Sequence, residues 1–376
     1  MNDGVGDGAL AGLRILDFSR VLAGPLATMV LGDLGAEVTK VERPGTGDDT
    51  RAWGPPYDAQ GRSTYFDAVN RNKRSIAIDL ADDADLARVR RLVADADVVV
   101  ENFRPGLLER FGLGYAQLAV VNPRLIYCSI TGFGSTPQAA ALPGYDLLVQ
   151  AMGGLMSITG EPDGEPQKVG VALVDVITGL FATVGILAAL AHRNATGAGQ
   201  LVEVDLFSAL LAALVNQSSS YTAAGVVPGR MGNEHPSIAP YAVFRAGAER
   251  LVLAVGNDRQ FQDLCRVLGA PALAADERFA TNPARVEHRE ALRLELERLL
   301  AARPAAEWTR LLTDARVPAG AVNDLGGAFE LAARLGLEPI VALAGPDGSV
   351  VKLPRNPLKL SRTPVSYRLT PPDLPA

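Results

Sequence analysis

The chain has 376 residues with a formal net charge of −6, and 48% of its residues are hydrophobic, which is typical of a globular protein with a large and a small domain. The acidic balance, without a basic cluster among aromatic residues, excludes nucleic acid as an expected partner. The two cysteines are far apart and the three histidines lack ligand spacing, so we predict neither a disulfide framework nor a bound metal.

No targeting segment is expected. Residues 1–7 contain neither a basic region nor an apolar core, so we expect a cytoplasmic protein without a signal peptide. The most apolar run, residues 176–191, is interrupted by Gly179 and Gly185. We interpret this run as a buried core helix, and we expect no membrane partner.

The first half of the chain alternates between predicted strands and predicted helices. Residues 13–18 alternate like a strand, residues 22–34 favour a helix, and residues 37–42 favour a second strand, which together predict a βαβ unit. Further strands are predicted, after a Gly- and Pro-rich loop, at residues 75–80, 97–101, 125–131 and 200–206. The pattern predicts the α/β fold class, with a doubly wound Rossmann-like large domain. No GxGxxG motif follows the first strand, so a nicotinamide dehydrogenase is poorly supported.

The character of the sequence changes after about residue 222. We predict a large domain formed by residues 1–222 together with residues 340–376, and a smaller α+β domain over residues 225–325. Linkers are expected near residues 212–240 and 325–350, where Gly and Pro interrupt the apolar periodicity.

Asp175 is the one charged residue in the apolar run 169–181. A buried carboxylate is costly unless something stabilises it, and two interpretations remain open. Asp175 is either the N-cap of the long helix that follows, or a nucleophile that the positive end of that helix keeps ionised at neutral pH. The two roles are compatible, and this segment alone does not decide between them.

Several short segments occur in an order that extends over most of the chain. They are Gly12–Ser19, Ala23–Pro25, Asp33–Gly45, Asn72–Ser75, Val100–Gly106, Gly144–Asp146, the Asp175 segment and Gly232–Pro236. Taken together, they resemble the class III CoA-transferase family, which includes formyl-, carnitine- and dicarboxylate-type enzymes and the related acyl-CoA racemases. The resemblance implies the interlocked-dimer CoA-transferase type of fold.

The resemblance implies that Asp175 attacks an acyl-CoA thioester, gives a mixed anhydride, and then carries CoA as an aspartyl thioester. Coenzyme A, as acyl-CoA, is the implied co-substrate and a carboxylic acid is the second substrate, with no tightly bound cofactor. The implied CoA contacts, by position in the family motifs, are Val21, Ala23, Arg43, Asn102, Phe103 and Arg110. On the residues alone, the two arginines also fit surface ion pairs, Phe103 fits core packing and Asn102 fits a turn.

The resemblance also points to substrate-pocket candidates, which are Tyr145, Asp146, Gly232 and His235. Tyr145 stands where the racemases have histidine, so an enzyme that exchanges an α-proton with two bases would lack one of them. Tyr145 could instead bind the reacting carbonyl or pack in the core. The Gly232–Pro236 segment is more similar to the branch that handles succinyl-CoA and other dicarboxylates.

Three functions therefore remain open. The first is a CoA-transferase that acts through Asp175, the second is an acyl-CoA racemase or isomerase of the same fold, and the third is a non-catalytic CoA-binding protein in which Asp175 only caps a helix. The resemblance further implies a homodimer of two ring-shaped chains threaded through each other.

Overall fold

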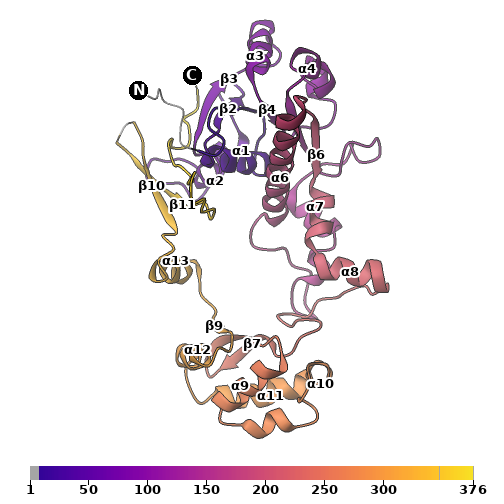
Figure 1. The fold of residues 1–376 in the computed structure, drawn as a ribbon, viewed down its shortest axis with the longest axis vertical. Coiled ribbons are helices and arrows are strands. Elements are labelled where there is room, and N and C mark those ends of the chain that lie inside the picture. The colour runs from indigo at the N-terminus through magenta and orange to yellow at the C-terminus, as the bar shows by residue number, and fades with distance from the viewer. Residues whose placement is uncertain (1–7, 347, 376) are drawn as a thin grey trace. The chain divides into compact units, whose positions relative to one another are not determined.

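The computed structural model describes residues 8–346 and 348–375 (Figure 1). Residues 1–7, on which the prediction of no signal peptide rests, lie outside the described residues. The chain divides into two compact units. Unit 1 comprises Met1–Leu155, Lys168–Val227 and Glu338–Ala376, and unit 2 comprises Met156–Gln167 and Pro228–Leu337.

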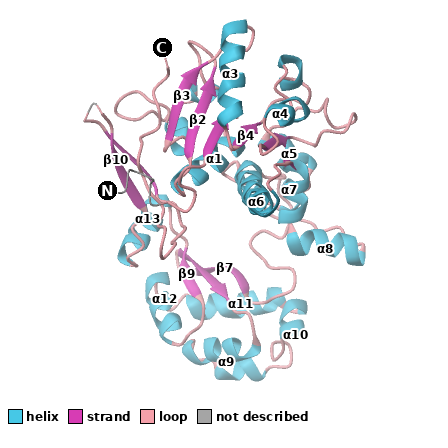
Figure 2. Ribbon diagram, turned by 45° about the horizontal axis from the view of Figure 1, so that its top comes forward, coloured by secondary structure: helices cyan, strands magenta, loops and turns pink. Residues whose placement is uncertain are grey.

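A six-stranded parallel sheet forms the centre of unit 1. Its strands are β1 (Arg14–Asp17), β2 (Glu37–Glu42), β3 (Lys73–Ala77), β4 (Val98–Glu101), β5 (Ile126–Thr131) and β6 (Leu201–Asp205). They run in the order β3-β2-β1-β4-β5-β6, so the strand order reverses between β1 and β4. This is the order of a doubly wound α/β domain, as the alternation of strands and helices predicts. Figure 2 shows β3 and β2 side by side within this sheet.

Helices cover both faces of this sheet. The helices of unit 1 are α1 (Ala23–Asp33), α2 (Thr64–Ala68), α3 (Asp83–Asp95), α4 (Tyr115–Val121), α5 (Asp146–Met152), α6 (Leu173–Thr196), α7 (Leu206–Ala213) and α8 (Val215–Ala224). One core packs α1 and α6 against the sheet through Leu31 and Ile186, which are both fully buried. The other core packs α3 and α4 against the opposite face, through Val93 and Leu118. Strand side chains are apolar on both faces because both faces are covered.

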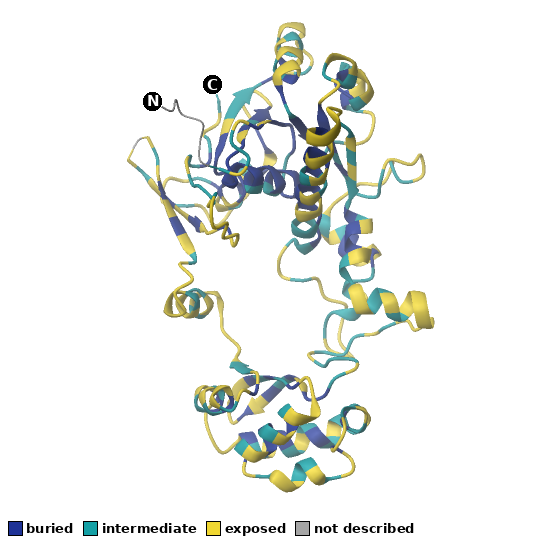
Figure 3. Cartoon of the chain, viewed as in Figure 1, coloured by how far each residue is buried: buried dark blue, intermediate teal, exposed yellow. Residues whose placement is uncertain are grey.

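Helix α6 is long and apolar enough to cross a membrane, by length and composition alone. Its residues Val174, Ala182, Ile186 and Ala189 are fully buried in the core of the sheet, which is the packing of a core helix. The opposite side of α6 stays exposed (Figure 3).

The C-terminal segment packs back on unit 1. Strands β10 (Ile340–Ala344) and β11 (Val350–Pro354) form an antiparallel hairpin. Beyond it, the Asn356 side chain donates a 2.9 Å hydrogen bond to the buried carboxylate of Asp33, which also pairs with Arg71 at 2.6 Å. Arg368 reaches the carbonyl of Gly32 at 2.8 Å, so polar contacts bind the segment to the end of α1.

Unit 2 is a smaller α+β assembly. Its antiparallel sheet has the order β7-β8-β9, from Tyr241–Ala246, Glu249–Ala254 and Ala319–Ala321, and β7 pairs with β8 in an antiparallel register. Its helices are α9 (Asp258–Val267), α10 (Asn282–Glu287), α11 (Arg289–Leu300), α12 (Ala305–Asp314) and α13 (Leu325–Arg334). One core of its own unites the sheet with α9, α11 and α12.

The units differ from the predicted domains in several segments, since unit 2 extends to Leu337 and the predicted linkers 325–350 and 212–240 contain α13 and α8. Residues 156–167 were predicted within the large domain but cluster with unit 2. The reason is a set of hydrogen bonds to backbone carbonyls, in which Gly232 donates to Gly160 at 3.0 Å and Arg230 donates to Gly164 at 2.8 Å. Backbone carbonyls belong to every residue type, so the sequence pattern carried no sign of this association.

Candidate active site

A cavity of about 600 Å³ opens in unit 1 at the carboxyl ends of the central strands. Ser19 to Ala23 follow β1, Asn102 and Phe103 follow β4, and Gly132 follows β5. Open parallel sheets bind ligands at the point where the strand order reverses, because the loops after neighbouring strands diverge there. Of the predicted site residues, the cavity brings together Val21, Ala23, Asn102, Phe103, Arg110, Tyr145, Asp146 and Asp175.

Asp175 lies in the first turn of α6 but is not its N-cap, which is Ala172. The backbone N–H groups of this turn donate instead to the carboxylate of Asp146 in α5. The Asp146 Oδ1 atom lies 2.8 Å from the Val174 nitrogen and 3.3 Å from the Asp175 nitrogen. The capping interpretation of Asp175 is therefore wrong, because a carboxylate from another helix takes that role. Among the residues that the structure describes, none donates a hydrogen bond to the Asp175 carboxylate.

The environment of Asp175 favours its neutral form. Burial, together with the negative charge of Asp146, raises the pKa of Asp175 to about 7. The sequence interpretation expected full ionisation at neutral pH from the helix dipole. That expectation is wrong, because Asp146 occupies the helix amides and adds a like charge. Near neutral pH the group is thus about half ionised, which is poised for chemistry.

The loop between β1 and α1 forms one wall of the cavity, and Asn102 holds its backbone. The Arg20 nitrogen donates to Asn102 Oδ1 at 2.8 Å, and Asn102 Nδ2 donates back to the Arg20 carbonyl at 2.7 Å. The Arg20 guanidinium lies 4.9 Å from the ring centroid of Phe103. The side chains of Asn102 and Phe103 therefore fix the loop as well as line the cavity.

Cationic side chains gather at the cavity. Arg20, Arg104 and Arg110 line it directly. Arg43, a predicted CoA contact, is not among the lining residues. Arg43 instead contacts a lining residue, Asp49, with its Nη2 atom 2.5 Å from the Asp49 carboxylate. Arg20 lies 3.3 Å from the same carboxylate. Two arginines thus share one carboxylate and leave a net positive charge, which suits an anionic ligand.

Tyr145 and Ala23 occupy opposite environments. Tyr145 is the N-cap residue of α5 and is 65% exposed, so the interpretation that it packs in the core is wrong. Ala23 begins α1 and is almost fully buried. A small residue at this helix start leaves room for a ligand to approach the backbone.

The model of CoA-transferase family III matches residues 10–376 of the chain. The chain belongs to CoA-transferase family III. It is 47% identical to the succinate–glutarate CoA-transferase of Agrobacterium fabrum, over 97% of this chain and 92% of that protein. It is 43% identical to the acetyl-CoA:oxalate CoA-transferase of Acetobacter aceti, over 94% and 90% of the two proteins. A solved CaiB/BaiF family protein from Brucella suis is 44% identical, covers 98% of this chain and 96% of its own, and superposes with a TM-score of 0.86.

These relatives decide among the three functions left open by the sequence. The chain is a CoA-transferase enzyme of class III, with acyl-CoA as substrate, and its fold is that of the family. The prediction of a CoA-transferase is thereby confirmed. The racemase and the non-catalytic CoA-binding protein are the alternatives that lose support.

Two predicted pocket residues of this CoA-transferase belong to unit 2. Gly232 has a φ of 60°, and its nitrogen donates to the Gly160 carbonyl at 3.0 Å. His235 accepts a hydrogen bond from the Ser237 nitrogen at 3.1 Å, and its ring lies 5.3 Å from the ring of Tyr241. Their assignment to the substrate pocket stays a prediction.

Tyr65, in α2, does not line the cavity, but it lies close enough to feel the charges of Asp175 and Asp146, and the sequence interpretation did not single it out. Burial and the charges of Asp175 and Asp146 raise the pKa of its phenol to about 12, so the group remains a neutral hydrogen-bond donor. Its ring packs edge-on against Trp53, with the centroids 5.1 Å apart. The available signal was this aromatic pair inside an otherwise Gly- and Pro-rich loop, but no motif connects that loop to α6.

The raised pKa of Asp175 predicts a pH-dependent gain in stability for Asp175→Asn. In the native protein the pKa is about 7, above the ordinary 3.8, so the cost of the buried charge is absent below about pH 4 and grows as the pH rises to about 7. The neutral amide avoids this cost. We expect Asp175→Asn to raise the free energy of unfolding by about 1–3 kcal/mol at about pH 8, and by almost nothing near pH 4.

Urea unfolding across this pH range measures the effect. The matched control is Asp163→Asn, which changes an exposed loop acid and should show no such trend. An Asp175→Asn protein with the same stability increment at both ends of the range would contradict the assignment of a raised pKa.

Proposed function

We propose that this enzyme transfers CoA from succinyl-CoA to a dicarboxylic acid such as glutarate, with Asp175 as the covalent nucleophile. The observation that carries the proposal is the Asp175 carboxylate, which lines the cavity, receives no hydrogen bond from the described residues and has a pKa of about 7. Nothing in its surroundings competes with an incoming carbonyl for its lone pairs.

The chemistry proceeds by four acyl transfers. An Asp175 oxygen attacks the thioester carbonyl of the donor, the C–S bond breaks, and a mixed anhydride and CoA thiolate result. The thiolate then attacks the aspartyl carbonyl, which releases the donor acid and leaves CoA on Asp175 as a thioester. The acceptor carboxylate displaces CoA thiolate from that thioester to form a second anhydride. The thiolate finally attacks the acceptor's acyl carbon, which yields the new acyl-CoA and restores Asp175.

The surroundings of Asp175 suit this sequence. A carboxylate is a weak nucleophile that hydrogen-bonding water weakens further, and the anhydride is lost if water reaches it. Burial reduces both effects.

The CoA moiety would lie along the β1–α1 loop. Arg20, Arg104 and Arg110 at the cavity would meet its phosphates, and Arg43 would add charge from behind Asp49. The pantetheine arm would lie against the backbone of residues 20–23, which the Asn102 side chain fixes through its two hydrogen bonds to the backbone of Arg20.

The acceptor is inferred from the relatives. Glutarate is named for the protein of Agrobacterium fabrum and for that of Mus musculus, which is 43% identical over 97% of this chain. Oxalate is named for the Acetobacter aceti protein. A dicarboxylate is common to these names, so we propose a dicarboxylate acceptor and expect glutarate to be preferred.

We further propose that the enzyme is a homodimer, and that the interlocked arrangement typical of the family applies. Helix α6 exposes Leu180 by 48%, Phe181 by 45% and Val184 by 61%. Leu201 on the edge strand β6 and Leu211 on α7 are also about 40% exposed. Apolar side chains gathered on one element and its neighbours are typical of a surface that a second chain covers.

The nucleophile is tested by trapping. Incubation with succinyl-CoA followed by hydroxylamine should place a hydroxamate on the peptide that contains Asp175, because hydroxylamine attacks an aspartyl thioester or anhydride. We expect Asp175→Ala to lose the hydroxamate and to lower kcat by about 10³-fold or more. Peptide mass spectrometry and steady-state kinetics measure the two effects. Full turnover by Asp175→Ala, or a hydroxamate on another residue, would sink the assignment.

The substrate pair is tested by a matrix assay. Succinyl-CoA and acetyl-CoA serve as donors, each against glutarate, oxalate and a monocarboxylate of similar length, with products read by mass spectrometry. With succinyl-CoA as donor, we expect kcat/KM for glutarate to exceed kcat/KM for the monocarboxylate by about 100-fold, because the monocarboxylate lacks the second carboxylate and its charged contact. Equal rates for both acceptors would contradict a dicarboxylate pocket.

Assembly is tested by sedimentation. The wild-type enzyme should sediment as a particle of about twice the 39.5 kDa of one chain at micromolar concentration. Val184→Glu, on the exposed side of α6, should shift the sedimentation distribution toward the monomer or reduce the yield of folded protein. The control, Val120→Glu, changes a residue of α4 that is 81% exposed and should leave the distribution unchanged. A wild-type particle near 40 kDa at every concentration would refute the dimer.

A further inference from the structure

Val21 has a backbone conformation that is unusual for its residue type. Its φ is 70°, in the left-handed region, although its side chain is β-branched. That conformation is costly for valine and persists only where neighbouring groups impose it. Val21 lines the cavity, between Arg20 and the start of α1. The strained peptide therefore lies where we propose that acyl-CoA binds.

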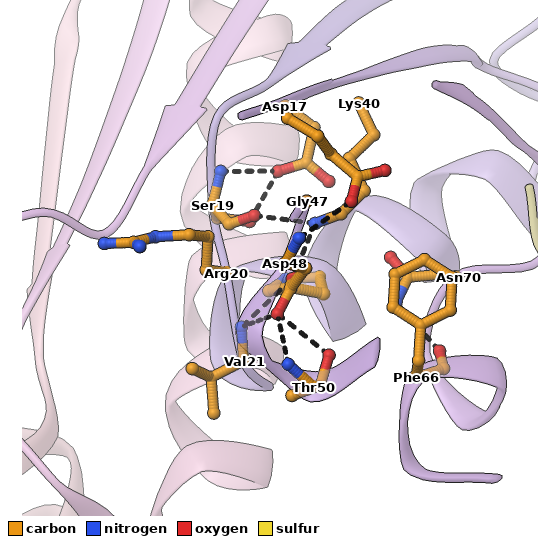
Figure 4. A network of polar contacts seen from close by, with 12 residues as sticks. Asp17, Ser19, Arg20, Val21, Lys40, Gly47, Asp48, Thr50, Phe66 and Asn70 are labelled. Atoms are coloured by element: carbon orange, nitrogen blue, oxygen red, sulfur yellow. Dashed lines mark hydrogen bonds and ion pairs between the residues drawn. The ribbon is translucent and has the colours of Figure 1, made fainter. Parts of the chain in front are cut away.

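The backbone nitrogen of Val21 is bound by Asp48, from the segment after β2. The Val21 nitrogen donates to both carboxylate oxygens of Asp48, at 3.3 Å each (Figure 4). The same carboxylate accepts from the Thr50 nitrogen at 3.0 Å and from its hydroxyl at 2.8 Å. Asp48 is 1% exposed, so water does not compete for these bonds.

Lys40 holds Asp48 and the loop together. Its ammonium lies 2.9 Å from Asp48 Oδ2 and donates to the Ser19 carbonyl at 2.8 Å, and both charged side chains are fully buried. Burial alone would raise the pKa of Asp48, but the charge and hydrogen bonds of Lys40 and Thr50 lower that pKa below its ordinary value. The pair thus contacts the loop at Ser19 and at Val21, on both sides of the residue that Asn102 holds.

We propose that Asp48, held by Lys40, is a positioning residue that keeps Val21 in the left-handed conformation and so shapes the loop for acyl-CoA. The inference rests on the proposed function only in taking the cavity as the CoA site. Asp48 touches no reacting atom. It acts through the backbone of Val21, after which α1 begins at Ala23 with no side-chain cap from Leu22.

A simpler role competes with this one. Asp48 is also the N-cap of the short helix Asp49–Ala52, through the Thr50 nitrogen. If that cap were its whole role, its loss would change stability without changing CoA binding specifically. The conformation of Val21 separates the two roles, because glycine adopts a positive φ as readily as a negative one.

The test is a double-mutant cycle of Asp48→Asn with Val21→Gly. We expect Asp48→Asn to raise the Kd for CoA and the KM for succinyl-CoA about tenfold and to leave the KM for the acceptor acid unchanged. In the Val21→Gly background, Asp48→Asn should raise the Kd for CoA and the KM for succinyl-CoA only about twofold, since glycine adopts a positive φ without restraint. Calorimetry of CoA binding and steady-state kinetics measure both.

The matched control is Thr50→Val, which removes one hydrogen bond to Asp48 but none to Val21 and should leave CoA binding unchanged. If Asp48→Asn does not fold, Asp48→Asn with Lys40→Met replaces it throughout the cycle, because that pair leaves no unpaired buried ammonium. An equal effect of Asp48→Asn in both backgrounds, or unchanged CoA binding, would overturn the inference alone. A wild-type enzyme that binds no CoA would overturn both this inference and the proposed function.

Discussion

The buried ion pairs beneath the β1–α1 loop are the interaction on which the cavity depends. Lys40 pairs with Asp48 at 2.9 Å and Lys73 pairs with Asp17 at 3.1 Å, and all four side chains are fully buried. Each buried charge is costly unless its partner and hydrogen bonds are in place, so these groups tolerate few alternative arrangements. These ion pairs also restrain the β1–α1 loop, because the Ser19 carbonyl accepts a hydrogen bond from Lys40 and the Ser19 nitrogen donates to Asp17.

The loop that these ion pairs hold lines the same cavity as Asp175, a carboxylate that has no cationic partner among the described residues. Asp175 is partly buried and has neither the cations nor the hydrogen-bond donors of the paired carboxylates, and the pKa values of Asp175 and Asp48 shift in opposite directions. Burial raises the pKa of both acids, so the opposite directions come from the neighbouring charge, which is Lys40 for Asp48 and Asp146 for Asp175. The same fold thereby keeps structural acids charged and leaves one acid reactive.

Much of the fold followed from local patterns. The alternation of apolar strands with helices indicated the parallel sheet, whereas Val21, Ala23 and Asn102 were assigned to one site by the family resemblance, and the structure places all three at the cavity. The family motifs sharpened this further. Asp175 was conspicuous because a lone acid in an apolar run needs an explanation.

By itself, then, the sequence determined the α/β class and the strands of the parallel sheet, since periodicity and chain order encode these directly, and its family motifs indicated residues of the cavity. Only the tertiary structure decided which acid caps α6, which protonation state Asp175 favours, and that Tyr65 lies near these two acids. Those outcomes depend on contacts between residues far apart in the chain, as between Asp146 and the amides of α6. No local pattern records such contacts, because the energy of a buried charge depends on whichever groups the fold brings beside it.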